Sequence, residues 1–329
     1  MQPFSYSRPR SLNEAMALLQ SGDNVQAIAG GTTVVDLMRL DVMTPRRLVL
    51  LDGLDELRGI DTSDGVLRFG ALATMSEVAA DPVVRNDYPV LYQSLWKAAS
   101  PQLRNVASVG GNLLQQTRCP YFRDTASACN RREPGSGCDA IPGNNTLHAV
   151  LGTSEQCIAT YPGDWAVALV ALDASIEIAG AGGVREMKVK DLHRLPDSEP
   201  WHETVLAERE LITAITVPAS PLGKNSVYTK VRERESYAFA SASSAVALSM
   251  DGDTVQDARI AVGGVATVPW RAETAEQSLI GKALNEETAT EAGQIVFADA
   301  RAYTHNAYKI PLGIDTVAEA LLTVARGGA

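Results

Sequence analysis

The heptapeptide Ala27-Ile28-Ala29-Gly30-Gly31-Thr32-Thr33 joins a short apolar run at residues 25–29 to a predicted helix over residues 33–40. A strand that runs through two glycines into a helix leaves backbone N–H groups unpaired, and such groups can bind a pyrophosphate without a cationic side chain. The stretch lacks the G-x-G-x-x-G spacing of a nicotinamide site. It therefore predicts either a phosphate-binding loop in a small α/β unit or a plain tight turn.

A second glycine-rich stretch, Ser108-Val109-Gly110-Gly111-Asn112, lies further along the chain and again combines paired glycines with small polar neighbours. Two loops of this kind can hold one pyrophosphate from both sides. The pair therefore favours dinucleotide binding more strongly than either loop alone.

Composition limits the kinds of partner. Lysine plus arginine number 29 and aspartate plus glutamate 39, so the net charge is 29 − 39 = −10. A chain this acidic is not expected to bind nucleic acid or an acidic membrane. The start, Met1-Gln2-Pro3-Phe4-Ser5, has no cationic region followed by an apolar run, and no apolar stretch is long enough to span a bilayer. We expect the chain to fold and acquire cofactors in the cytoplasm.

The order of predicted elements indicates an α+β protein of two domains, an ordinary number for 329 residues. The first domain, residues 1–220, comprises a subdomain at 1–60 and another at 61–220, and Pro218 to Gly223 forms the boundary. The second, residues 221–329, is a separate α+β domain. Thr74-Met75-Ser76-Glu77 matches a capping box. Strands are predicted at 25–29, 48–51, 66–71, 175–178, 211–217, 226–231, 241–250 and 258–262, and helices at 33–40, 90–99, 165–172, 271–280, 286–299 and 316–326.

Residues 118–160 interrupt this pattern and contain all four cysteines: Cys119, Cys129, Cys138 and Cys157. A long irregular segment with every thiol suggests a four-thiolate site, either iron–sulfur or zinc, while two disulfides are a further alternative. The cysteines are separated by nine, eight and eighteen residues, whereas zinc sites usually contain closer pairs. Four arginines against Asp124 and Glu133 give residues 118–138 a local charge of 4 − 2 = +2, which suits an anionic iron–sulfur cluster.

The two glycine motifs together carry a family resemblance. A-G-G-T at residues 29–32 and R-N-x-A-S-x-G-G-N at 104–112 resemble the FAD-binding subunit of the xanthine dehydrogenase, or molybdenum hydroxylase, family. The likeness extends from Phe4 to G-G-V-A-x-x-P-x-R at 263–271. The cysteine-containing insert, with R-C-P-Y-F-R-D at 118–124, resembles the flavin subunit of bacterial three-subunit aldehyde oxidoreductases, which carry a [4Fe–4S] cluster here.

This resemblance implies a fold and a set of site residues. The fold is a two-subdomain FAD-binding domain with an iron–sulfur insert at 118–160, followed by the C-terminal flavoprotein domain. The cluster ligands would be the four cysteines. The implied flavin contacts are Ala27, Ile28, Ala29, Gly30, Gly31, Thr32, Thr33, Ser108, Gly111, Asn112, Asp164, Ile212 and Lys230.

The resemblance also implies a function. The chain would be the electron-transfer subunit of a molybdenum-dependent aldehyde oxidoreductase, and it would carry FAD and [4Fe–4S] but no catalytic residue of its own. Its partners would be a large subunit with the molybdenum cofactor and a small [2Fe–2S] subunit, in a heterotrimer. The acceptor would be an external one-electron carrier such as a ferredoxin. A partner's signal could export the complex, so both cytoplasm and periplasm are open as its final site.

Two other functions stay open from the residues alone: a self-sufficient flavin oxidoreductase, and a zinc-stabilised scaffold that binds proteins. His148 is placed by its position between Cys138 and Cys157 either beside the cysteine site or as a ligand within it. His193 is expected at the surface. Tyr237 and Phe239 are assigned either to flavin stacking or to the core.

Overall fold

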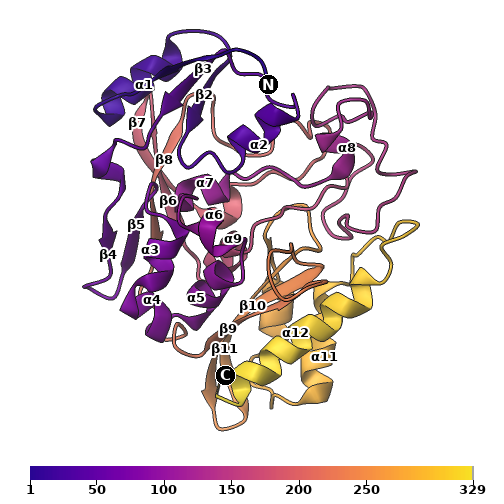
Figure 1. Ribbon diagram of the computed structural model, residues 1–329. Coiled ribbons are helices and arrows are strands. Elements are labelled where there is room, and N and C mark those ends of the chain that lie inside the picture. Colours follow the sequence, from indigo (N-terminus) through magenta and orange to yellow (C-terminus); the bar gives the residue numbers. More distant parts are fainter. Residues whose placement is uncertain (328–329) are drawn as a thin grey trace.

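The computed structural model describes residues 1–327, which form three separate β-sheets with helices packed between and around them (Figure 1). Sheets and helices are intermixed along the chain in the order expected of an α+β protein. The predicted fold class is confirmed.

The first sheet is small and parallel, with its strands in the order β1-β3-β2. Parallel neighbours need crossover connections, and helices provide them here. The Ser11 hydroxyl caps the first helix by accepting from the Glu14 N–H at 3.2 Å, while the Glu14 carboxylate accepts from the Arg10 N–H. The bounds are β1 Ser5–Ser7, α1 Leu12–Gln20, β2 Val25–Ile28, α2 Val34–Arg39 and β3 Arg47–Leu50.

The second sheet has five antiparallel strands in the order β4-β5-β8-β6-β7. The capping box predicted at Thr74 is present, because Thr74 and Glu77 each accept a hydrogen bond from the backbone N–H of the other. Asp81 caps a helix that the sequence had not indicated. The bounds are β4 Ile60–Asp61, β5 Leu67–Gly70, α3 Met75–Ala80, α4 Pro82–Asp87, α5 Pro89–Trp96, α6 Pro101–Arg104, α7 Val109–Leu113, α9 Trp165–Ala171, β6 Ser175–Gly180, β7 Gly183–Lys188 and β8 Leu211–Val217.

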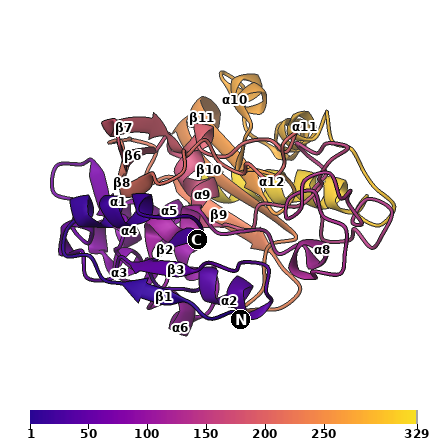
Figure 2. The same ribbon diagram turned by 90° about the horizontal axis from the view of Figure 1, so that it is seen from above.

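The third sheet is antiparallel in the order β12-β11-β10-β9, and three helices cover one of its faces (Figure 2). The last helix begins at Lys309 rather than at the predicted residue 316. Pro311 lies in its first turn, where a missing N–H costs no hydrogen bond. The bounds are β9 Ser226–Val231, β10 Ala242–Asp251, β11 Thr254–Gly263, β12 Trp270–Arg271, α10 Glu273–Leu279, α11 Glu286–Val296 and α12 Lys309–Ala325.

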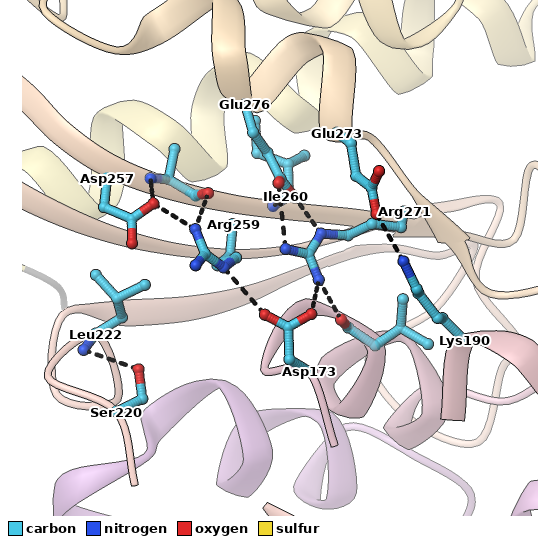
Figure 3. A network of polar contacts seen from close by, with 12 residues as sticks. Asp173, Lys190, Ser220, Leu222, Asp257, Arg259, Ile260, Arg271, Glu273 and Glu276 are labelled. Atoms are coloured by element: carbon cyan, nitrogen blue, oxygen red, sulfur yellow. Dashed lines mark hydrogen bonds and ion pairs between the residues drawn. The ribbon is translucent and has the colours of Figure 1, made fainter. Parts of the chain in front are cut away.

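The helix α9 joins the second and third sheets. All seven of its residues are buried, and the core around it includes residues of both sheets. Just beyond its end, Asp173 accepts from Arg271 at 2.8 Å and from Arg259 at 3.2 Å, and Arg271 also pairs with Glu276 of α10 (Figure 3). This buried and half-buried ion network fixes the third sheet against the rest of the molecule.

The cysteine-containing segment is irregular, as predicted, apart from the single turn of α8, Pro120–Arg123 (Figure 1). Cys129 and Cys138 face each other in an isolated antiparallel bridge, and the Asn130 N–H donates to the Gly137 carbonyl at 2.7 Å. Local turns of this kind shape the segment. No helix within residues 1–327 is both long and apolar enough to cross a membrane.

Candidate functional site

The two glycine-rich stretches touch each other. A Cβ built on Gly30 would lie 1.7 Å from the backbone oxygen of Val106, so no side chain fits between the loops at this point. Gly31 has a φ of +73°, a conformation that favours glycine. The first pair of glycines therefore serves close contact between loops as well as any contact with a ligand.

The second stretch forms the start of α7. The Ser108 hydroxyl accepts from the Gly111 N–H at 3.3 Å, so these two groups already satisfy each other. Asn112 differs, because its side-chain Oδ1 is buried and has no hydrogen-bond partner in the described structure. A buried acceptor without a partner is costly unless a ligand supplies a donor. Asn112 is thus suited to contact a bound polar group.

Between these loops and the third sheet lies a cleft of about 500 Å³, within the usual size range of cofactor sites. Thr32, Thr33, Gly111, Asn112 and Asp164 line it. The other predicted flavin contacts are not among its lining residues: Ala27, Ile28, Ala29, Gly30, Gly31, Ser108, Ile212 and Lys230. We refer to this space as the dinucleotide cleft.

Asp164 and Lys230 form a buried ion pair at the cleft. Lys230 Nζ lies 2.8 Å from Asp164 Oδ2, and the Tyr228 hydroxyl donates to Asp164 Oδ1 at 2.7 Å. Burial and the nearby carboxylate charge raise the pKa of Tyr228, so it remains a donor. Tyr228 and Lys230 therefore hold the Asp164 carboxylate in position. Asp164 lines the cleft, whereas Lys230 does not, so Lys230 can influence the cleft through Asp164. Flavin contacts by either residue remain predictions.

All four cysteines line a second, much smaller cavity, which we call the thiol chamber; its other lining residues include Phe122, Ala140 and Ala159. Every cysteine has a free thiol. Within residues 1–327 no three His, Cys, Asp or Glu side chains are close enough to hold a single metal ion. Because all four thiols are free, the disulfide alternative is wrong for this structure.

The chamber has the donor set that a larger cluster needs: four thiols from dispersed loop positions, two of them on buried and two on partly buried residues. Burial raises the pKa of Cys119 to about 12, while backbone N–H groups of Phe122 and Tyr121 oppose that rise. The Ala159 N–H points to Cys157 Sγ at 3.5 Å. N–H groups directed at sulfur stabilise an anionic cluster, so these residues fit an iron–sulfur group.

Both parts of the chain match known families of protein domains. Residues 2–220 match the FAD binding domain in molybdopterin dehydrogenase, and residues 226–324 match the CO dehydrogenase flavoprotein C-terminal domain. The chain belongs to the molybdenum hydroxylase flavoproteins. One relative is the aldehyde oxidoreductase FAD-binding subunit PaoB of Escherichia coli K12, which is 44% identical over 98% of each chain. The glyceraldehyde dehydrogenase medium chain of Sulfolobus acidocaldarius is 29% identical over 86% of this chain and 83% of its own.

Solved structures agree with this assignment. Carbon monoxide dehydrogenase of Hydrogenophaga pseudoflava superposes on 100% of this chain and 99% of its own, with a TM-score of 0.77 and 26% identity. Quinoline 2-oxidoreductase of Pseudomonas putida 86 covers 99% of this chain and 98% of its own, with a TM-score of 0.75 and 25% identity. The family resemblance drawn from the sequence is confirmed, and the flavoprotein is an oxidoreductase subunit with an FAD-binding domain.

One wall of the flavoprotein's cleft contains Tyr237 and Phe239, whose roles the sequence did not decide. Tyr237 and Phe239 line the cleft with exposed fractions of 55% and 48%, so they do not belong to the core. The Arg118 guanidinium lies over the Phe239 ring at 5.2 Å. Tyr237 has a φ of +54°, which shows a tight turn that no glycine or proline signals. This wall becomes visible only because residues 233–241 and the glycine loops line the same cleft in three dimensions.

The arginines of the cysteine segment correct one expectation. Arg118 and Arg123 pair with Asp36 of α2, and Arg132 donates to the backbone carbonyls of Tyr121 and Phe122. These three therefore anchor the segment instead of facing the thiols as a group. Their sequence positions could not show this, because Asp36 lies more than eighty residues away.

Arg131 is the exception among these arginines. Its Nη1 lies 2.9 Å from Glu203 Oε2, with exposed fractions of 9% and 20% for the two side chains. Burial disfavours the Arg131 charge, but Glu203 and Cys157 outweigh it and raise its pKa. A permanent positive charge thus lies beside one thiol.

The prediction that His193 lies at the surface is also wrong. Its ring nitrogen Nε2 lies 2.9 Å from the Leu113 carbonyl, and its ring packs on Tyr161 with centroids 4.5 Å apart. Burial lowers its pKa to about 4. The imidazole is therefore a neutral, partly buried group and not a freely exposed one.

Proposed function

We propose that this chain is the electron-transfer subunit of a molybdenum-dependent aldehyde oxidoreductase, with FAD in the dinucleotide cleft and a [4Fe–4S] cluster on Cys119, Cys129, Cys138 and Cys157. The observation that carries the proposal is the convergence of all four thiols on one chamber beside the cleft. The 44% identity to a protein named as an aldehyde oxidoreductase FAD-binding subunit supports the substrate class.

The chemistry divides between subunits. Oxidation of an aldehyde with water to a carboxylic acid releases two electrons and two protons, and we place that step on a partner with the molybdenum cofactor. FAD, when bound, supplies the exchange between two-electron and one-electron transfer, and the cluster supplies one-electron transfer. Two equivalents of a one-electron carrier, such as a ferredoxin-like protein, would accept the electrons.

This chain's own residues would bind and hold the cofactors. The two glycine loops would present backbone N–H groups to the pyrophosphate, and Asn112 would use its free Oδ1 on a donor of the dinucleotide. The Asp164 carboxylate, held by Lys230 and Tyr228, would accept from ribityl or ribose hydroxyls. Four thiolates from the chamber would ligate iron.

The ligand assignment is tested with Cys129→Ser, since Cys129 is buried in the chamber and lies away from the cleft. The variant should retain FAD but lose the broad iron–sulfur absorbance, together with iron and acid-labile sulfide. Thr125→Ala is the matched control, because Thr125 is exposed in the same segment. Unchanged iron in Cys129→Ser, or zinc in place of iron in the wild type, would contradict the assignment.

The proposed partners are tested by co-expressing this chain with a candidate molybdenum-cofactor subunit and a candidate small [2Fe–2S] subunit. Relatives whose names describe them as medium chains or FAD-binding subunits are parts of larger enzymes. We expect the purified complex to contain a molybdenum-cofactor subunit and a small [2Fe–2S] subunit in equal amounts. A chain that purifies alone and reduces its own FAD with an aldehyde would instead indicate a self-sufficient oxidoreductase.

A further inference from the structure

The dinucleotide cleft and the thiol chamber share one wall. Cys119 lines both cavities, whereas Cys129, Cys138 and Cys157 line only the chamber among the residues that the structure describes. Arg118 and Pro120, its chain neighbours, also line the cleft. Any cofactor in the chamber therefore comes nearest to the cleft at Cys119.

His148 lies at the same wall. Its Nε2 is 3.1 Å from Cys119 Sγ, the residue is only 2% exposed, and it also lines the cleft. In residues 1–327 its other ring nitrogen, Nδ1, has no hydrogen-bond partner. A neutral imidazole has one donor nitrogen and one acceptor nitrogen, whereas a ligating thiolate can only accept. At 3.1 Å from such a sulfur, Nε2 is therefore the nitrogen that carries the proton.

The backbone around His148 is held by the C-terminal part of the chain. Asn306 Nδ2 donates to the His148 carbonyl at 3.3 Å and to the Ala149 carbonyl at 3.0 Å. Lys309 Nζ donates to the Leu147 carbonyl at 3.1 Å and to the Gly264 carbonyl at 2.7 Å. Such support fixes the direction of the imidazole, which is what a residue that orients or tunes a ligand requires.

We propose that Cys119 is the cluster ligand facing the flavin, and that His148 is a positioning residue whose Nε2–H donates to the Cys119 sulfur. A donor to a ligating sulfur withdraws negative charge and favours the reduced cluster, so it raises the reduction potential. His148 thereby makes electron transfer from flavin to cluster more favourable. This inference rests on the proposed function, since it requires the cluster to be present.

The test is the cluster's midpoint potential, measured by redox titration followed by EPR in the purified complex. In His148→Phe the N–H···S hydrogen bond is lost, and the flavin–cluster equilibrium should move about tenfold toward the flavin, which equals about 59 mV for one electron. His148→Gln keeps an N–H donor and should restore most of the shift. His193→Phe is the control, because the His193 ring is hydrogen-bonded to a backbone carbonyl and not to a thiol.

Three outcomes separate the possibilities. A loaded His148→Phe variant with an unchanged potential overturns the inference while leaving the proposed function intact. Wild-type protein without iron and acid-labile sulfide overturns the proposed function itself. Should His148→Phe fail to load, the reduced wild type labelled with ¹⁵N-histidine decides by electron spin echo modulation: a weak coupling to one histidine nitrogen supports the hydrogen bond, and no coupling refutes it.

Discussion

The dinucleotide cleft and the thiol chamber are adjacent but are built in different ways. The cleft is lined by parts of the chain as far apart in sequence as Thr32 and Gly264. The chamber comes from one segment, residues 119–159, and its donor groups are thiol side chains. The comparison teaches that the cleft depends on how closely distant loops approach, whereas the chamber depends on anchors that hold one irregular segment in shape.

The largest effect is expected at the loop contact of the cleft. Gly30→Ala would place a Cβ 1.7 Å from the Val106 carbonyl oxygen, and neither backbone can yield without parting the loops. FAD affinity should fall at least about 100-fold, or roughly 3 kcal/mol, by fluorescence titration of deflavinated protein. Gly53→Ala is the matched control, because nothing lies within 4 Å of its added Cβ. Iron content should be unchanged; a variant that keeps its FAD affinity would show that the loops move independently.

The next effect concerns the anchor beside the chamber. Arg131→Met leaves the Glu203 carboxylate largely buried without its partner, which should lower the free energy of unfolding by about 3 kcal/mol. The double variant Arg131→Met/Glu203→Gln removes the orphaned charge and should recover a large part of the loss. Urea unfolding of the deflavinated, metal-free protein measures both. Equal losses in the single and double variants would mean that the ion pair is not the cause.

The smallest effect is expected at the outer anchor, Asp36, which pairs with Arg118 and Arg123. Because Asp36 is 35% exposed and screened by solvent, Asp36→Asn should cost only about 1 kcal/mol. Its control is Glu291→Gln, in an exposed pair with Lys282, which should change stability by less than about 0.5 kcal/mol.

The pH dependence of this loss follows from the pKa of Asp36. A hydrogen bond from Arg123, followed by the charges of both arginines, lowers that pKa in spite of partial burial. Since the folded-state pKa lies below the unfolded value, the stabilisation is present above about pH 4 and is lost as the pH falls through the folded value. The difference between wild type and Asp36→Asn should therefore be constant from pH 5 to 8. A difference that grows as the pH falls would contradict this sign.

Local patterns in the sequence predicted much of the fold. The strands at Leu211–Val217 and Ser226–Val231 match their predicted limits, because alternation and apolar runs are properties of adjacent residues. The strand at Ser5–Ser7 was missed, since three polar residues gain their strand character only by pairing with β3. The start of the last helix was also missed, because the structure begins it at Lys309 and not at the predicted residue 316.

The candidate site shows the same difference between features that the sequence predicts and features that only the structure reveals. The glycine loops and the four cysteines could be found from motifs, because each motif is contiguous or confined to one segment. The contact of Gly30 with Val106, the pairing of Arg131 with Glu203 and the approach of His148 to Cys119 join residues 29 to 76 positions apart. No period or spacing encodes such pairs, so the structure alone supplies them.

The grip of Asn306 and Lys309 on residues 147–149 has a consequence for biosynthesis. The segment that carries His148 cannot reach its final shape while α12 is still inside the ribosome, although the cysteines have emerged long before. The wall that the thiol chamber shares with the cleft, at which His148 lies, is therefore completed only after the last helix has been translated. An assembly factor would meet a nascent chain whose thiols are still accessible and whose final wall has not yet closed.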